Sequence, residues 1–167
     1  MKKFACLVLL MILLTCKRDD SASLPDLTKD EINAGRFWDR ITEETNYKKY
    51  PMWPDHKGMQ PGVSPHGRYH IVYINGKLRD AIPIADKSAP YGAMSIKENF
   101  NADKKLVAIT AMVKIKDYNP EHGDWFWAEY DPDGKVLVEG KESMCINCHI
   151  SFNNDYITIR KLDKKLK

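Results

Sequence analysis

Cysteine is scarce in this chain of 167 residues, which contains only four: Cys6, Cys16, Cys145 and Cys148. Cys6 lies in the apolar N-terminal segment and Cys16 directly follows that segment, so only Cys145 and Cys148 lie in the body of the chain. This count gives no basis for a framework of disulfides, which small secreted domains usually build from several cysteine pairs.

Long apolar runs are also absent. The longest, residues 4–14, follows Lys2 and Lys3 and is too short to span a membrane, but it has the length of a signal peptide. Residues 13–16 read Leu-Leu-Thr-Cys and resemble a lipobox, where bacterial lipoproteins are cleaved and lipidated on the new N-terminal cysteine. We therefore predict a signal peptide over residues 1–15 and a lipid on Cys16 that anchors the protein on the periplasmic side of a bacterial membrane. An ordinary signal peptide cleaved near residues 21–23 is the alternative.

Charge of one sign is not in excess. The chain has 26 basic and 23 acidic residues, and removal of residues 1–15 takes away Lys2 and Lys3 and no acid, which leaves 24 against 23. A nucleic-acid partner, which requires a concentrated basic face, is not expected. Residues 16–27 are polar and indicate a tether, residues 28–160 a single domain, and the basic residues 161–167 a solvated tail.

The pattern of the domain favours an α+β fold in which β-structure dominates. Thr28 and Glu31 form a capping-box pattern that predicts a helix, with apolar residues at a spacing of three and four, ending before Pro51. The residues after about position 68 are mostly β-branched or aromatic, with turn residues between them. The predicted strands cover residues 69–74, 93–97, 106–115, 125–130, 135–139 and 155–159. We expect a single antiparallel sheet with an N-terminal helix and a C-terminal CxxCH segment packed over it.

The sequence Cys-Ile-Asn-Cys-His at 145–149 is the most informative motif. C-x-x-C-H is typical of covalent attachment of a c-type haem, in which both thiols form thioethers and the adjacent His149 binds the iron. Covalent haem attachment occurs outside the bacterial cytoplasm, which agrees with the export signal. A zinc site would need ligands from the other histidines, and a thioredoxin-like redox pair would need a βαβ unit that the sequence does not show.

The motif does not determine which group occupies the second axial position of the iron. A methionine or histidine there would make the protein a six-coordinate electron carrier that exchanges electrons with a redox partner. Each candidate can equally be an ordinary core or surface residue. The candidates are Met94, Met112, Met144, His70 and His122. The aromatic residues 125–127 would fill the core or form a wall of the haem pocket.

Several short segments occur in the order found in the cytochrome P-460 family, and the chain resembles that family over roughly residues 30–160. The segments are 65–67 (PHG), 72–75 (VYIN), 96–98 (IKE), 112–114 (MVK), 122–128 (HGDWFWA), 134–135 (GK), 145–149 (CINCH) and 155–156 (DY).

The resemblance implies a β-rich homodimer with one haem c whose iron is five-coordinate through His149. In the cytochromes P-460 proper, a lysine that matches Lys97 is bonded to a meso carbon of the porphyrin, and the enzymes oxidise hydroxylamine and bind nitric oxide. The related cytochromes c′-beta lack this bond and bind nitric oxide or carbon monoxide. Without the resemblance, Lys97 would be taken for a solvent-facing lysine of a strand.

Two departures from the family pattern bear on activity. The hydroxylamine-oxidising members carry a distal glutamate where this chain has Thr110, and an arginine where it has His70. These differences predict binding of nitric oxide with slow or absent hydroxylamine turnover. The imidazole of His70 would replace the missing proton acceptor only if its strand faces the pocket, and a partly exposed strand histidine is the alternative.

Overall fold

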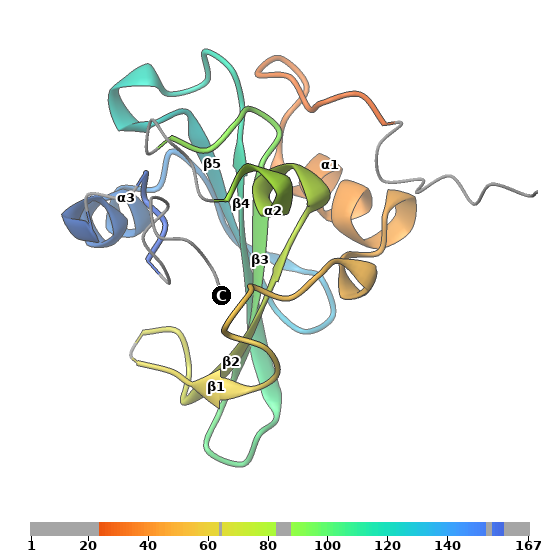
Figure 1. Ribbon diagram of the computed structural model, residues 1–167, viewed down its shortest axis with the longest axis vertical. Coiled ribbons are helices and arrows are strands. Elements are labelled where there is room, and N and C mark those ends of the chain that lie inside the picture. Colours follow the sequence, from red (N-terminus) through yellow and green to blue (C-terminus); the bar gives the residue numbers. More distant parts are fainter. Residues whose placement is uncertain (1–23, 64, 83–87, 153–154, 159–167) are drawn as a thin grey trace, which may run out of the picture.

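The computed structural model describes residues 24–63, 65–82, 88–152 and 155–158, and an antiparallel sheet forms its centre (Figure 1). The six strands of the sheet lie side by side in chain order. They are β1 (Gln60–Pro61), β2 (Tyr69–Ile74), β3 (Met94–Phe100), β4 (Leu106–Lys114), β5 (Trp125–Tyr130) and β6 (Val136–Gly140). The predicted α+β fold with one dominant antiparallel sheet is therefore confirmed.

Five of the six predicted strands are present with small changes of boundary. The predicted strand at 155–159 is wrong for the part that the structure describes, because residues 155 and 156 form a turn with positive φ angles of 48° and 63°. Extended pairing requires negative φ, so these two residues cannot continue a strand. The short strand β1 lies in a region rich in proline and glycine, ahead of the first predicted strand.

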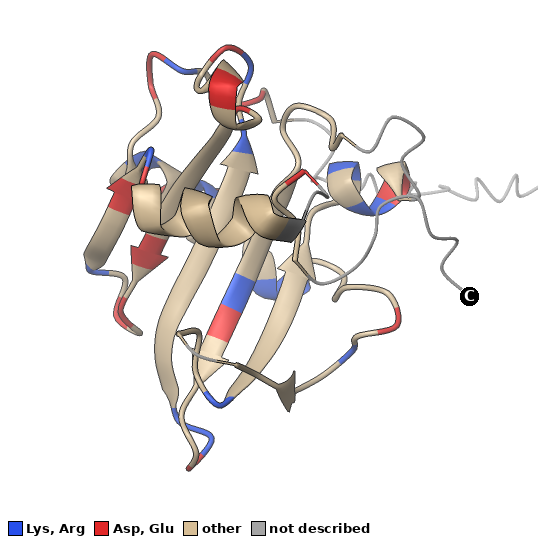
Figure 2. Ribbon diagram, turned by 90° about the vertical axis from the view of Figure 1, so that its left-hand side faces the viewer, with Lys and Arg blue, Asp and Glu red and all other residues tan. Residues whose placement is uncertain are grey.

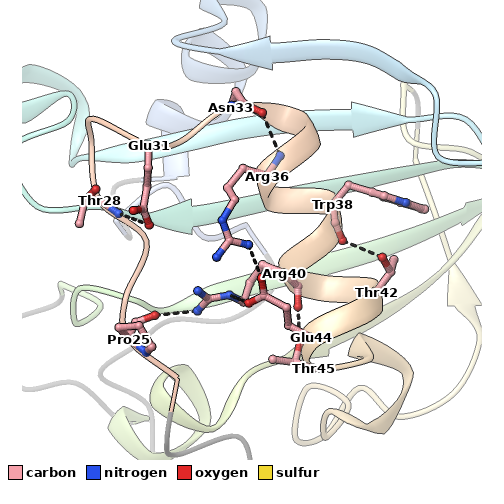
Figure 3. Close-up of polar contacts among 10 residues, drawn as sticks. All are labelled: Pro25, Thr28, Glu31, Asn33, Arg36, Trp38, Arg40, Thr42, Glu44 and Thr45. Atoms are coloured by element: carbon pink, nitrogen blue, oxygen red, sulfur yellow. Dashed lines mark hydrogen bonds and ion pairs between the residues drawn. The ribbon is translucent and has the colours of Figure 1, made fainter.

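The N-terminal helix α1 (Ala34–Asp39) starts later than predicted (Figure 3). The backbone N–H of Thr28 donates to the carboxylate of Glu31 at 3.3 Å, as in half of a capping box, but this pair closes only an isolated turn. Asn33 is extended and its side chain accepts from the N–H of Arg36 at 2.8 Å, so Asn33 is the true N-cap. The predicted N-cap at residue 28 is therefore wrong by five residues.

The helical segment does not continue as one α-helix to Pro51. A π-helical turn, Arg40–Glu44, continues α1, and a separate 3₁₀ turn, Tyr47–Lys49, precedes Pro51. The predicted apolar face is confirmed, because Phe37 and Ile41 are fully buried against the sheet.

Asn75 and Gly76 begin a helix that the sequence did not predict, α2 (Gly76–Ala81). The side chain of Asn75 accepts from the N–H of Leu78 at 3.1 Å and from the N–H of Met94 at 3.0 Å. One residue thus caps the helix and also ties it to β3.

The two faces of the sheet bury different clusters, and the helices α1 and α3 (Ser143–His149) cover opposite faces (Figure 1). Alternation along β5 shows the division, because Phe126 belongs to the cluster under α1 while Trp125 and Trp127 belong to the cluster under α3. Figure 2 looks onto the face with α3, where the helix lies across the strands. The position of the CxxCH motif over the sheet follows from this packing.

The predicted signal peptide (1–15), the lipid-bearing Cys16 and the basic tail (161–167) lie outside the described residues. Among the described residues, no helix is both long and apolar enough to cross a membrane.

Candidate functional site

The helix α3 holds all three residues of the haem motif. It starts at Glu142, whose carboxylate caps the N–H of Met144 at 3.1 Å, and Ile146 anchors it in the apolar cluster of the sheet. Cys145 is half-buried and turned toward the sheet, whereas Cys148 is exposed, and both thiols are free. Burial raises the pKa of Cys145 to about 11, with smaller contributions from nearby Glu142 and Glu129, so this thiol is protonated at neutral pH.

His149 ends α3 with its ring fixed from two sides. Its Nδ1 lies 2.7 Å from the carbonyl oxygen of Tyr156, and since a carbonyl only accepts, Nδ1 must carry the hydrogen. The ring also contacts the indole of Trp127, with centroids 4.7 Å apart at 72°. Burial lowers the pKa of His149, although the bond to the Tyr156 carbonyl opposes this. The result is a neutral imidazole with Nε2 left for another partner, as a metal ligand requires.

A pocket lies between α3 and the sheet, and its wall is mainly apolar. The predicted iron ligand His149, the half-buried Cys145 and the candidate Lys97 all reach it. The full lining consists of His66, Val72, Ser95, Lys97, Thr110, Ala111, Met112, Trp127, Ala128, Glu129, Cys145, His149, Ile157 and Thr158.

The register of the sheet places three polar residues in one row across the floor of this pocket. Lys97 of β3 pairs with Thr110 of β4, and Thr110 pairs with Glu129 of β5. Side chains of directly paired residues lie on the same face of a sheet, about 5 Å apart at their Cβ atoms. The two sequence candidates Lys97 and Thr110 are therefore neighbours, as members of one site should be.

The position of Lys97 is unusual for a lysine. Burial lowers the pKa of Lys97 to about 8, and no carboxylate among the described residues forms an ion pair with its amine. The interpretation of Lys97 as a solvent-facing strand lysine is therefore wrong. Its neighbour Glu98 faces the opposite side of the sheet, where the hydroxyl of Tyr47 donates to it at 2.9 Å.

Glu129 is the pocket residue that the sequence reasoning missed. Its carboxyl group lines the pocket, and burial raises the pKa of Glu129 above its usual value. The sequence contained a sign of this position. Glu129 follows Trp127 by two residues in a predicted strand, so the two side chains must lie on the same face of the sheet. Position 110 has a threonine and no carboxylate, but Glu129 on the adjacent strand β5 places a carboxylate beside it.

The two histidines near the pocket differ in role. His66, which follows a loop proline, lines the pocket, and its ring centroid lies 6.2 Å from that of His149. His70 is only 8% exposed and its Nε2 lies 2.9 Å from Nε2 of His56, so the expectation of a partly exposed residue is wrong. Burial, followed by the nearby charge of Lys97, lowers the pKa values of His66 and His70 to about 4. Both imidazoles are therefore neutral at pH 7.

The other candidates for the second axial ligand differ in whether they line the pocket. Met112 lines the pocket, whereas Met94 belongs to the cluster on the opposite face of the sheet. Met144 is 70% exposed, and His122 contacts the hydroxyl of Tyr156 at 3.3 Å. Among the five candidates from the sequence, only Met112 is thus part of the pocket wall.

The donor set fits a covalently held haem. Two free thiols lie three residues apart on one helix, the adjacent histidine keeps Nε2 available, and the wall beside it is aromatic. The indole N–H of Trp127, a residue of the pocket wall, is buried without a hydrogen-bond partner. Among the described residues, no group of three or more His, Cys, Asp and Glu is arranged to hold a metal ion by itself.

Comparison with protein families agrees with this site. The model of the family described as Cytochrome P460 matches residues 44–159, which is well over half of the chain and includes the pocket and the motif. A search of curated proteins gave no match.

Proposed function

The chain belongs to the cytochrome P460 family, which implies a c-type haem with iron, and on that premise we propose that it binds nitric oxide or a similar small molecule at one haem. In this proposal, Cys145 and Cys148 hold the haem and His149 binds the iron as the only protein ligand. The observation that carries it is the bond from Nδ1 of His149 to the Tyr156 carbonyl, because it leaves Nε2 free at a pocket lined by Cys145. When bound, the haem supplies an iron that can take up a diatomic molecule.

The pocket supports a small and weakly polar ligand. Val72, Met112 and Trp127 give it an apolar wall. A pocket with an apolar wall and polar groups at fixed places, here Lys97, Thr110 and Glu129, selects a ligand by its size and by its fit to those groups.

Hydroxylamine oxidation is a second candidate, and Glu129 is the observation that favours it. Oxidising hydroxylamine requires removal of protons as well as electrons, and a carboxylate is a suitable acceptor. A raised pKa makes the carboxylate of Glu129 a stronger base than a solvent-exposed glutamate. The missing glutamate at Thr110 therefore does not leave the pocket without a base.

Electron transfer by a six-coordinate haem is a third candidate, and His66 favours it. This imidazole is neutral and lies in the pocket beside His149, so a second nitrogen ligand is available there. His66 was not among the residues that the sequence indicated for the second axial position.

Absorption spectra of the purified, reduced protein with and without nitric oxide separate these candidates. We expect a five-coordinate, high-spin spectrum that changes when nitric oxide is added. A six-coordinate, low-spin spectrum that becomes high-spin in His66→Ala, but not in the control Met94→Leu on the opposite face, would instead establish the electron carrier. Turnover with hydroxylamine and an electron acceptor tests the second candidate.

We further propose export to the periplasmic side, anchoring through a lipid on Cys16, assembly as a homodimer and electron exchange with a redox partner. The motif at residues 13–16 supports the first two, and the resemblance to the family supports the homodimer. Fractionation of cells, with mass analysis of the mature N-terminus, tests the anchor.

A further inference from the structure

A buried ion pair joins the end of β4 to the turn after α3. Nζ of Lys114 lies 2.7 Å from Oδ2 of Asp155, and the two side chains are only 6% and 7% exposed. Asp155 also accepts from the backbone N–H of Ala89 at 2.6 Å and from the indole of Trp125 at 3.3 Å, while Lys114 donates to the hydroxyl of Ser88 at 2.9 Å. These contacts hold Asp155 from three separate segments of the chain.

The turn held in this way has a strained backbone. Asp155 and Tyr156 are consecutive non-glycine residues in the left-handed region, with φ angles of 48° and 63°. Such conformations persist only where the surroundings enforce them. Gly123 packs under the turn at positive φ, and a Cβ on it would lie 3.0 Å from the Tyr156 ring and 3.1 Å from the Asp155 carboxylate. The ion pair and this close packing together fix the direction of the Tyr156 carbonyl.

That carbonyl accepts the hydrogen bond from Nδ1 of His149 at 2.7 Å. Hydrogen bonds to the outer nitrogen of a ligand histidine set its ring orientation and its basicity toward the metal. We propose that Lys114 and Asp155 are positioning residues, which set the strength of the bond from His149 to the haem iron by holding the Tyr156 carbonyl. This inference rests on the proposed function, in which His149 is the iron ligand.

The test uses the reduced haem protein and two variants, Asp155→Asn and the double variant Lys114→Met with Asp155→Leu. The single variant leaves the charge of Lys114 buried and unpaired, so it can fail to fold. The double variant replaces both charges with apolar side chains of similar size, which proteins tolerate much better. In either variant that folds, the carbonyl of Tyr156 is released from its enforced direction.

Resonance Raman spectroscopy reports the iron–histidine stretching vibration directly, and a redox titration reports the midpoint potential. We expect the stretching band to move to lower frequency and the potential to rise, because a weaker hydrogen bond makes His149 a weaker donor to ferric iron. The matched control is Tyr47→Phe, which removes a buried hydrogen bond to Glu98 on the opposite face of the sheet. The control should lower stability without moving the band.

Two negative results are distinguishable. If wild-type protein shows no iron–histidine band, or His149→Gly keeps the wild-type spectrum without added imidazole, the proposed function fails and the inference fails with it. If wild-type shows the band and the folded double variant keeps both its frequency and the wild-type potential, only the positioning role is overturned.

Discussion

Lys97 gives the sharpest prediction, because the structure changes the expected chemistry of its amine. A lysine in water has a pKa of about 10.5, so only about one amine in 3,000 is neutral at pH 7. With a pKa of about 8, roughly one in ten is neutral at the same pH, which is about 300 times more. A neutral amine is the nucleophilic form, so we predict that the pocket prepares Lys97 for bond formation to a porphyrin.

The cause of the lowered pKa is burial, and it comes from the place of Lys97 in the sheet. Its strand neighbours are Val72 and Thr110, and neither offers a charge. An ammonium group that is buried without a counter-ion loses hydration and gains nothing in return, so its neutral form is favoured. The same sheet position directs the amine into the pocket that contains Cys145 and His149.

The assay measures the yield of the bond between Lys97 and the haem as a function of pH. Replacing one N–H and one porphyrin C–H by a C–N bond removes two electrons, so a two-electron oxidant is added and is itself reduced. After digestion, the mass of the haem peptide shows whether the fragment with Lys97 remains attached. We expect the yield to rise with pH and to reach half of its maximum near pH 8.

Substitutions complete the test. Lys97→Ala and Lys97→Arg should abolish the bond and restore the spectrum of an ordinary c-type haem, whereas Lys105→Ala, which changes an exposed lysine, should leave it intact. A half-maximal yield near pH 10.5 would show that the pocket does not prepare the amine. A spectrum that Lys97→Ala leaves unchanged would place the protein with the c′-beta type, which lacks the bond.

Three further predictions concern the attachment, the anchor and the base. Haem should stay bound through denaturation in wild-type protein and be lost in the Cys145→Ala, Cys148→Ala double variant; extraction of free haem from wild-type by acidified acetone would contradict the attachment. Cys16→Ala should move the protein from the membrane to the soluble periplasmic fraction, and a mature N-terminus beyond residue 16 would contradict the lipid anchor. If the second candidate function holds, Glu129→Gln should slow hydroxylamine turnover by about 10²–10⁴-fold and leave nitric oxide binding intact. Activity that survives Glu129→Gln but increases in Thr110→Glu would assign the proton transfer to the position of Thr110 instead.

The strands were predictable because each carries a local signal. Residues 69–74 and 125–130 are dense in β-branched and aromatic side chains, and both match observed strands without a shift. The helix start was not predictable from the capping-box pattern, because Thr28 and Glu31 satisfy only a turn and the chain becomes extended at Asn33. Two competing caps within six residues cannot be ranked without knowing where the helix packs.

The helix α2 was missed for a related reason. Asn-Gly is a strong turn signal, and in this chain it follows a strand directly. Asn75 instead caps a short helix, because its side chain also bonds to the N–H of Met94 in the adjacent strand. This second bond is a tertiary contact, so the local sequence gives no sign of it.

The sequence allowed prediction only of those site residues that belong to a local sequence pattern. The motif at 145–149 and the lysine at 97 each have a sequence signature, but the importance of Glu129 arises from pairing between strands. Residues 97, 110 and 129 become neighbours because β3, β4 and β5 adopt one particular register, and a shift of one residue would turn Glu129 to the face of α1. Comparing Thr110 with the glutamate at the same sequence position tests only whether β4 carries a carboxylate. Proton transfer requires a carboxylate in the pocket, whichever strand carries it. Glu129 of β5 places a carboxylate in the pocket. The absence of a glutamate at position 110 is therefore weak evidence against proton transfer in this pocket.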